Sequence, residues 1–586
     1  MPNDIVVLKF GSSVLTSRTE LPTAVHEIYR WYRTGHRVVV VVSAIGDATD
    51  LLLTSARELA DPNGPNESAI PDPHATAELL ATGERASAAL MGIALDRAGI
   101  PARVLDPRDI QLSAVGSPMD SELISVNPAR LHFLSTETPV LVVPGFFGYD
   151  SDGRVHLLGR GGSDLTAVFL AHALDAARCR LIKDVDGVYE FDPASGAPTA
   201  PRRFAALTYS DALERAAPLV QPKAVHFLER HQRTAEVAAI GRSYASIIGG
   251  DPAGSKVSCP RAARPPTKVA LMGLGTVGLG VYRRLAAMKE DFEVTAILVR
   301  NPLKHGARGI PSRLLCTSPP SFLADNHERV DIVVDALPGV EPSNRLAAAF
   351  LQSGVSVVSA NKSMIAEAGP RLSALAGQAP ITMSRGPCEL FYSAAVGGSA
   401  PMIEAIRHVA RTPGIRSISG ILNGTCNYLL NLAADGAALH DALGKVQALG
   451  LAELNPIEDL SGRDAARKLR ILTRHAFGRD LDPERLDLEP IDVTTFPRAR
   501  QARATGQVLR LVATASLNPG RFTTHVRLEA LAAGHPLADV RGEWNRLLIE
   551  HTDGATTTIN GRGAGRWPTT EAVMADLLDF RMTDLR

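Results

Sequence analysis

A glycine pattern near the middle of the chain constrains the fold more than any other feature. The apolar run Val269–Met272 leads into Gly273-x-Gly275-x-x-Gly278, and an apolar helical pattern follows. Glycines in this context permit a tight turn and let a pyrophosphate approach the helix N-terminus. The arrangement predicts a dinucleotide-binding domain with a parallel sheet, whereas the glycines alone would be typical of an ordinary packing turn.

The region after the next predicted strand bears on the choice of dinucleotide. The strand Val294–Val299 ends in Arg300, and Lys304 follows closely. An acidic residue usually stands here in NAD-binding domains, because it holds the ribose 2′-hydroxyl. Two cations in its place predict a preference for the 2′-phosphate of NADP, with NAD as the alternative. Two solvated loop cations would give the same pattern.

The glycine pattern begins almost halfway along a chain of 586 residues, so another domain is expected before it. From residue 5 onwards, short β-branched runs alternate with longer amphipathic stretches, which predicts a second α/β domain with a largely parallel sheet. Gly and Pro residues in 249–266 interrupt this alternation as a linker does. We therefore predict a first domain at 1–250 and a linker at 251–267.

Composition restricts the partners. Lys plus Arg and Asp plus Glu both total 62, so no excess charge points to nucleic acid or a membrane surface. The run Val38–Val42 is far shorter than the roughly 18 apolar residues that span a bilayer. The five cysteines form no C-x-x-C pair, which argues against a disulfide framework or a zinc site. We expect a cytoplasmic protein that acts on small molecules and holds no metal of its own.

Four segments of the second half carry a family resemblance. They are Val357-Val-Ser-Ala-Asn-Lys362, Gly420-Ile-Leu-Asn-Gly-Thr-Cys-Asn-Tyr428, Ala452-Glu-Leu-Asn-Pro-Ile-Glu-Asp-Leu-Ser-Gly-Arg-Asp-Ala-Ala-Arg-Lys468 and Gly561-Arg-Gly-Ala-Gly-Arg-Trp-Pro-Thr569. In this order and spacing, the chain from residue 268 to its end resembles homoserine dehydrogenase.

The resemblance implies a domain plan and a reaction. It implies an NADP-binding Rossmann domain at 268–385, an α+β catalytic and dimerisation domain at 386–550, and a segment at 551–586 that returns to the nucleotide-binding domain. The expected reaction interconverts L-aspartate 4-semialdehyde and L-homoserine. The expected assembly is a homodimer or a higher homo-oligomer.

Aldehyde reduction by hydride transfer creates an alkoxide that needs a proton donor, and the reverse reaction needs a base. Asp464 and Lys468 stand four residues apart on one face of a predicted helix, with Ser461 as its expected N-cap. On spacing alone they would be a surface ion pair. The resemblance implies instead that they are the proton-transfer pair and that Lys362 is a second basic group facing the substrate.

The resemblance also assigns binding residues. It implies that Glu453 and Asp459 hold the polar groups of the substrate and that Gly424 and Thr425 line its pocket. The residues expected at the dinucleotide are Gly273, Gly275, Thr276, Val277, Gly278, Arg300, Lys304, Asn361 and Gly563.

The first half has no G-x-x-x-x-G-K-[ST] loop, yet three glycine-containing segments follow strands or open a helix. They are Lys9-Phe-Gly-Ser-Ser-Val14, Leu158-Gly-Arg-Gly-Gly-Ser-Asp-Leu-Thr-Ala167 and Asp184-Val-Asp-Gly-Val-Tyr-Glu-Phe-Asp-Pro193. Phosphoryl transfer needs positioning and charge cancellation, for which a lysine beside exposed backbone amides is suited. Each segment alone would be an ordinary turn.

Two further segments complete this pattern, Val42-Ser-Ala-Ile-Gly-Asp-Ala-Thr-Asp50 and Thr82-Gly-Glu-Arg-Ala-Ser87. Together the five resemble the amino-acid kinase family, specifically aspartokinase, over residues 4–255. The implied fold is a three-layer αβα sandwich, and the implied reaction is phosphorylation of L-aspartate to 4-phospho-L-aspartate by ATP with Mg²⁺.

The kinase resemblance assigns residues in the same way. It implies that Lys9 neutralises the transferring phosphoryl group. The residues expected to bind aspartate are Ser43, Thr49, Glu84, Arg160 and Ser163. The residues expected at the nucleotide are Gly11, Ser12, Asp184 and Tyr189.

The kinase half departs from its family in three places. The first loop is one residue short and looks as much like that of glutamate 5-kinase. Ala194 replaces an arginine, and the nucleotide-side lysine of a Gly-Ala-Lys segment has no clear counterpart around 216–223. The first half is therefore either a working kinase or a kinase-like module for assembly or ligand binding.

Phosphorylation of aspartate and reduction of aspartate semialdehyde would be two steps of one biosynthetic pathway that starts from aspartate. Members that fuse them usually carry paired regulatory domains (ACT domains) in between, yet here the dehydrogenase strand begins about ten residues after the closing segment of the kinase, Gly254–Ser258. We predict that threonine and lysine do not inhibit the kinase through such domains.

Overall fold

The computed structural model describes residues 4–60, 72–192, 195, 201–216, 219–242, 244–249, 265–378, 388–410, 414–452, 455–482, 486–518 and 521–583. They divide into two compact units. The first holds the described residues from 4 to 249 except 98–100, and the second holds 98–100 and the described residues from 265 to 583.

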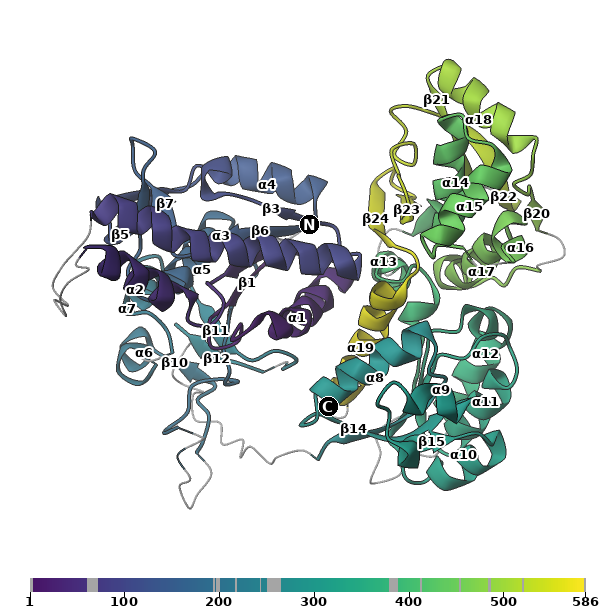
Figure 1. Ribbon diagram of the computed structural model, residues 1–586, viewed down its shortest axis with the longest axis horizontal. Coiled ribbons are helices and arrows are strands. Elements are labelled where there is room, and N and C mark those ends of the chain that lie inside the picture. The colour runs from purple at the N-terminus through teal and green to yellow at the C-terminus, as the bar shows by residue number, and fades with distance from the viewer. Residues whose placement is uncertain are drawn as a thin grey trace. The chain divides into compact units, whose positions relative to one another are not determined.

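The first unit, which begins with the purple segments in Figure 1, is built on an eight-stranded, mostly parallel sheet. The strand order is β10-β12-β11-β9-β1-β2-β6-β3. The strands are β1 (Ile5–Phe10), β2 (Arg37–Val42), β3 (Ala102–Val104), β6 (Val140–Pro144), β9 (Arg178–Ile182), β10 (Ala206–Leu207), β11 (Ala235–Ala238) and β12 (Ser246–Ile248). The helices are α1 (Leu21–Arg33), α2 (Ala48–Ala60), α3 (Pro73–Ala98), α4 (Pro128–Glu137), α5 (Gly162–Ala173), α6 (Tyr209–Arg215) and α7 (Pro222–Arg230).

Both faces of this sheet are covered, as a parallel sheet requires. Alternate residues of β1 and β2, such as Ile5 and Val39, join a core with α4, α5 and α7, and their neighbours Val6 and Val40 on the other face are equally buried. A small four-stranded sheet, in the order β5-β4-β7-β8, stands beside this layered body. Its strands are β4 (Ser113–Ser117), β5 (Asp120–Ser125), β7 (Phe147–Tyr149) and β8 (Val155–Leu157).

The second unit begins with a six-stranded parallel sheet in the order β15-β14-β13-β16-β17-β18. In chain order this is 3-2-1-4-5-6, the arrangement of dinucleotide-binding folds, whose ligands lie at the carboxyl ends of the strands where the order reverses. The strands are β13 (Thr267–Met272), β14 (Phe292–Leu298), β15 (Leu315–Cys316), β16 (Ile332–Asp335), β17 (Ser356–Ser359) and β18 (Leu390–Phe391). The helices are α8 (Thr276–Ala287), α9 (Pro302–Gly306), α10 (Pro319–Asn326), α11 (Ser343–Gln352), α12 (Lys362–Gln378) and α19 (Arg566–Thr583).

A second, mostly antiparallel sheet follows in the order β20-β22-β21-β19-β23-β24. Its strands are β19 (Ile415–Ile421), β20 (Asp487–Leu488), β21 (Gln507–Asn518), β22 (Arg521–Ala532), β23 (Trp544–His551) and β24 (Thr556–Arg562). Its helices are α13 (Met402–Val409), α14 (Gly424–Ala434), α15 (Leu439–Ala448), α16 (Ile457–Leu460), α17 (Arg463–Phe477) and α18 (Thr495–Ala504). Alternation along β21 places Leu511 and Ala513 in the helix-covered core and turns Thr514 and Ser516 to the other face.

The last described helix, α19, lies along α8 of the nucleotide-binding sheet (Figure 1). Gly280 permits this approach, because a Cβ there would stand 2.3 Å from Thr570 Oγ1. Arg284 Nη2 also donates to buried Glu571 Oε1 at 2.7 Å. Of the segment 551–586, α19 thus packs against α8, while β24 belongs to the antiparallel sheet. Among the described residues, no helix combines the length and hydropathy needed to cross a membrane.

Candidate active sites

The first turn of α17 carries an acidic residue that binds two lysines. Asp464 is buried, and its Oδ2 accepts from the Nζ of Lys468 at 2.8 Å, one helical turn away. Its Oδ1 contacts the Nζ of Lys362, the first residue of α12. The structure thus brings Lys362, the predicted second basic group, onto the same carboxylate as the predicted proton-transfer pair of Asp464 and Lys468.

The environments of the two lysines differ. The Lys468 side chain is only 7% exposed, and its Nζ also donates to the carbonyl oxygen of Leu422 at 2.7 Å. The Lys362 side chain is 42% exposed. Burial opposes the charged form of Lys362, yet the carboxylate of Asp464 outweighs burial and raises the pKa of this lysine. Burial likewise opposes ionisation of Asp464, but Lys468 and Lys362 hold the pKa of its carboxyl well below the ordinary value.

Asn423 joins this cluster, although sequence reasoning did not select it. It is the N-cap of α14, where its Oδ1 accepts from the backbone N–H of Cys426 at 2.8 Å. Its Nδ2 donates to Asp464 Oδ2 at 2.8 Å and to Asp459 Oδ1 at 2.7 Å. Burial, and then the charge of Asp464, raise the pKa of Asp459. The only local signal for Asn423 was its position between a strand and an apolar helix.

Two residues that the resemblance predicts to line the substrate pocket begin α14. Gly424 opens α14, and a Cβ there would stand 2.5 Å from the carbonyl oxygen of Glu543, so only glycine fits. Thr425 Oγ1 donates to the carbonyl oxygen of Leu451 at 2.7 Å. Glu453 lies outside the described residues.

The expected N-cap of α17 is wrong. Gly462, not Ser461, precedes the helix, with a left-handed φ of 77° that favours glycine. Ser461 is the C-cap of α16, and its Oγ points back to the carbonyl oxygen of Glu458 at 3.4 Å. Two helices meet within two residues here, so the turn between them determines the cap.

The glycine pattern forms the turn between β13 and α8. Gly273 has a φ of 97°, and a Cβ on Gly278 would stand 2.2 Å from its carbonyl oxygen. Gly275 is the N-cap, and a Cβ there would meet nothing within 4 Å, so its face is open. Thr276 and Val277 begin the helix. An open backbone cradle at a helix N-terminus fits a pyrophosphate.

The two predicted cations follow β14. Arg300 and Lys304 are both exposed, Arg300 two residues beyond the strand end and Lys304 in α9. The strand runs over Phe292–Leu298, two residues earlier at its start than expected. Gly563 lies in the turn between β24 and α19, where a Cβ would clash with the amide of Asn545. That amide donates to the carbonyl oxygen of Leu422 at 3.0 Å.

Asn361 belongs to a buried polar network at the carboxyl ends of β16 and β17. Its Nδ2 donates to the carbonyl oxygen of Gly339 at 2.6 Å and to Ser343 Oγ at 3.1 Å. Ser343 and Ser359 both donate to the fully buried carboxylate of Asp335 at 3.0 Å. Burial raises the pKa of Asp335 to about 6, although these hydrogen bonds oppose the shift. The loop after β16 that this network holds also touches the glycine turn, because a Cβ on Gly273 would stand 2.9 Å from the carbonyl oxygen of Ala336.

In the first unit, one buried carboxylate again binds two lysines. Lys9, near the end of β1, reaches Asp164 Oδ1 at 2.9 Å, and Lys183, directly after β9, reaches Asp164 Oδ2 at 3.0 Å. The backbone N–H of Gln221 donates to the same carboxylate at 3.3 Å. Only Lys9 was predicted. Asp164 and Lys183 were missed, although both stand in the quoted segments or beside them.

Two of the residues predicted at the nucleotide, Gly11 and Asp184, lie near Lys9 and Lys183. Gly11 follows β1, and a Cβ there would lie 3.0 Å from Lys9 Nζ, so the loop folds over the lysine. Ser12 and Asp184 are exposed. The hydroxyl of Tyr189 donates to Asp186 Oδ1 at 2.5 Å.

The residues predicted to bind aspartate lie on three neighbouring segments. Glu84 of α3 is buried, and its Oε1 accepts from the backbone N–H of Ala44 at 3.2 Å, next to Ser43. Burial raises the pKa of Glu84 to about 7, although the Ala44 hydrogen bond and the charge of Lys9 oppose the shift. Its Oε2 is buried without a partner in the described part of the chain. A polar substrate group would satisfy it.

The remaining three residues differ in exposure. Ser163 is buried at the start of α5 against Gly145, where a Cβ would stand 2.7 Å from that of the serine. Arg160 is almost fully exposed and reaches Asp50 at 3.6 Å, while Thr49 lies in the first turn of α2. Arg160 is thus positioned by a weak surface pair and can move to meet an anion.

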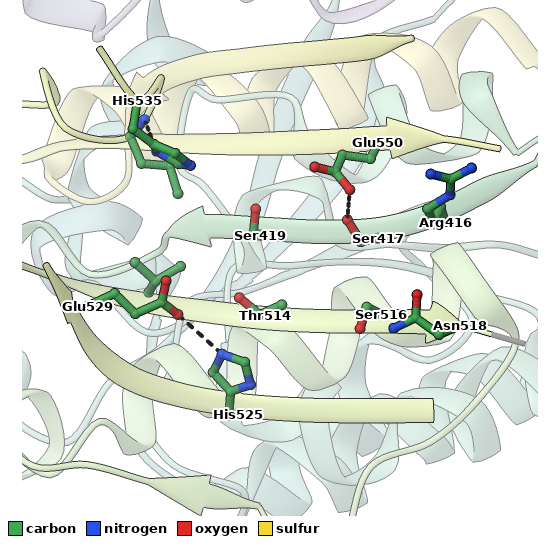
Figure 2. A pocket seen from close by; sticks show the side chains of 12 residues that line it. Arg416, Ser417, Ser419, Thr514, Ser516, Asn518, His525, Glu529, His535 and Glu550 are labelled. Carbon is green, nitrogen blue, oxygen red and sulfur yellow. Dashed lines mark hydrogen bonds and ion pairs between the residues drawn. The ribbon is translucent and has the colours of Figure 1, made fainter. Parts of the chain in front are cut away.

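A groove of 360 Å³ lies elsewhere, on the polar face of the antiparallel sheet (Figure 2). Ser417, Thr514 and Ser516 point into it from neighbouring strands. Ser417 Oγ donates to Glu550 Oε2 at 2.7 Å. None of the predicted site residues lines this groove.

Comparison with family models divides the chain in the same way. A model described as homoserine dehydrogenase matches residues 401–578, and one described as its NAD binding domain matches 273–383. A model of the amino acid kinase family matches residues 4–239.

Individual proteins are similar to the second unit. Homoserine dehydrogenase of Synechocystis sp. is 33% identical over 324 residues, which are 53% of this chain and 73% of the relative. That of Lactococcus lactis is 30% identical over 322 residues, with the same coverage. The solved homoserine dehydrogenase of Thiobacillus denitrificans is 34% identical, covers 55% of this chain and 74% of its own, and has a TM-score of 0.49.

Proposed function

Because the chain belongs to the homoserine dehydrogenase family and carries an amino acid kinase domain before that part, we propose that it is a bifunctional enzyme. The first activity phosphorylates L-aspartate with MgATP to give 4-phospho-L-aspartate. The second interconverts L-aspartate 4-semialdehyde and L-homoserine with NADP(H). The observation that carries the dehydrogenase proposal is the contact of the Asp464 carboxylate with Lys468 and Lys362.

The lysine ammonium groups supply what the aldehyde oxygen needs. A nicotinamide cofactor, bound at the open glycine turn, supplies or accepts the hydride. Lys468 uses two of its three N–H donors on Asp464 and Leu422, so the third is available to a substrate oxygen. In reduction this ammonium gives its proton to the oxygen as hydride reaches the carbon. In oxidation the neutral amine takes the hydroxyl proton.

Asp464 stays ionised in this scheme, because both lysines lower the pKa of its carboxyl. It therefore orients the two nitrogens without exchanging a proton itself. Asp459, held by Asn423, is available for the substrate ammonium group, and Glu453 is proposed for the same role.

The kinase half would act by positioning and charge cancellation. Lys9 meets the transferring phosphoryl group beside the glycine loop at Gly11, and Arg160 binds the aspartate α-carboxylate, for which a guanidinium offers a bidentate fit. Ser43, Thr49, Glu84 and Ser163 are proposed to hold the rest of the amino acid.

We propose NADP as the preferred cofactor because two exposed basic side chains, Arg300 and Lys304, follow β14. From the resemblance we also propose a cytoplasmic homodimer or higher homo-oligomer. The molar mass of the purified chain in solution, measured by light scattering, would test the assembly.

The test measures two activities of one purified chain: aspartate-dependent ADP release and NADP-dependent homoserine oxidation. Lys9→Ala should abolish the first and spare the second, whereas Lys468→Met should do the reverse. If the intact chain oxidises homoserine but releases no ADP with aspartate, the first unit is a kinase-like module without this activity. If homoserine is not oxidised, the dehydrogenase proposal fails.

A further inference from the structure

Lys183 has the geometry of a second active-site lysine in the first unit. It directly follows β9, which pairs in parallel with β1 so that Lys9 lies opposite Leu181. Both lysines therefore stand at the carboxyl edge of the sheet on adjacent strands. Lys183 Nζ lies 3.0 and 3.2 Å from the two oxygens of Asp164, and Lys9 Nζ lies 2.9 Å from one of them.

The cluster has a surplus of buried positive charge. Lys9 is 4% exposed, Lys183 8% and Asp164 3%, so two ammonium groups share one carboxylate away from water. Burying a charged group costs free energy unless an opposite charge or hydrogen bonds compensate it. The charge of Lys9 also acts on Glu84, but burial raises the pKa of this carboxyl group to about 7, so near neutral pH it is only partly ionised. The arrangement is suited to a polyanionic ligand.

The lysine closest in sequence to the expected Gly-Ala-Lys position is engaged elsewhere. Lys223, at the start of α7, lies 2.5 Å from Asp120 and 3.5 Å from Glu122, and it donates to the carbonyl oxygen of Ser121 at 3.2 Å. Its charge is therefore balanced by carboxylates of β5, whereas the charge of Lys183 adds to that of Lys9.

We propose that Lys183 is a catalytic residue of the kinase half and binds the polyphosphate of ATP together with Lys9, while Asp164 positions both ammonium groups. This inference rests on the proposed phosphorylation of aspartate. In that step a β-carboxylate oxygen of aspartate bonds to the γ-phosphorus, the bond to the β,γ-bridging oxygen breaks, and ADP leaves with that electron pair. No proton is transferred, so the task of the two lysines is to stabilise the moving negative charge.

The pH dependence gives a signature that a merely structural role would lack. Burial, and then the charge of Lys9, lower the pKa of Lys183 to about 8, while Asp164 and Asp184 oppose the shift. Lys183 is charged below this value and neutral above it. The kcat/KM for ATP, which reports the free enzyme, should therefore fall as pH rises through about 8. Lys183→Arg keeps the charge and should remove this fall.

The experiment compares Lys183→Met, Lys183→Arg and Lys223→Met in the full chain. Lys183→Met should lower the kcat of aspartate-dependent ADP formation roughly 100-fold or more and weaken MgATP binding. Lys223→Met should change either quantity by less than about threefold, because the ion pairs that it removes are partly exposed. Homoserine oxidation by the same chains measures the concentration of folded enzyme, and thermal unfolding shows whether the first unit is intact.

The outcomes separate the inference from the proposed function. A Lys183→Met chain that binds MgATP and turns over within threefold of the parent overturns the inference. A larger loss of ADP formation or MgATP binding in Lys223→Met than in Lys183→Met also overturns it. If the parent forms no ADP with aspartate, the proposed kinase function fails, and the MgATP dissociation constant alone decides the role of Lys183. Equal constants for parent and Lys183→Met overturn it.

Discussion

Replacing Asp464 by asparagine tests the dehydrogenase site at its centre. The variant keeps the shape of the side chain and removes the charge that Lys468 and Lys362 share. It also tests whether Asp464 acts as a fixed counter-ion, because an amide can still accept hydrogen bonds but cannot balance two ammonium groups.

The magnitude follows from the burial of each partner. Lys468 is nearly inaccessible, and loss of one member of a buried pair costs about 3–5 kcal/mol. The Lys362 side chain is 42% exposed, so solvent screens its pair, which adds about 1 kcal/mol at most. The second unit should therefore lose about 3–6 kcal/mol near neutral pH, out of the 5–15 kcal/mol typical of a domain. The kcat of homoserine oxidation should fall by about 100- to 10,000-fold.

The pH dependence has a definite sign. The pKa of Asp464 is lower in the folded protein than its ordinary 3.8, because two lysines favour the ionised form against burial. The stabilisation is therefore fully present above the unfolded pKa and is lost as pH falls below about 4. The parent should be more stable than Asp464→Asn at pH 7, and the difference should shrink towards pH 3.

Urea-induced unfolding of the second unit would be followed by limited proteolysis. Homoserine oxidation would be measured without urea, with aspartate-dependent ADP formation as the control in the same chain. Kinase activity should be unchanged, because Asp464 lies in the second unit only. The reasoning is refuted if the variant unfolds within about 0.5 kcal/mol of the parent at pH 7, or if it oxidises homoserine at a comparable rate.

Three further perturbations address other parts of the chain. Gly278→Ala places a Cβ 2.2 Å from the carbonyl oxygen of Gly273, so it should abolish NADP binding measured by fluorescence titration; retained affinity would contradict the tight-turn argument. Burial raises the pKa of Glu84 from 4.5 to about 7, so ionisation of Glu84 destabilises the first unit as pH rises from 4.5 to 7. Glu84→Gln should therefore raise the free energy of unfolding of this unit by up to about 3 kcal/mol at pH 8 and leave it unchanged at pH 4. Replacing Arg300 and Lys304 together by serine should lower the NADP-to-NAD ratio of kcat/KM at least about tenfold, and an unchanged ratio would show that neither cation reaches the 2′-phosphate.

Much of the fold could be predicted from local pattern. The strand, glycine turn and helix around Gly273 depend on interactions within a few residues, and so does the placement of Asp464 and Lys468 on one helix face. Family models match both halves that the sequence motifs indicated. Cap placement was less predictable, since Gly462 rather than Ser461 precedes α17.

The amino-acid sequence by itself determined the two α/β halves and one lysine–carboxylate pair in the dehydrogenase half, because helical and strand periodicity bring near neighbours together. Only the tertiary structure decided that Lys362, distant in sequence, shares the carboxylate of Asp464, and that Lys183 joins Lys9 on Asp164. Those contacts depend on which parallel strands lie side by side and on which helices face their carboxyl ends. Sheet order is set by packing of the whole unit, so the periodicity of single helices and strands could not reveal these contacts.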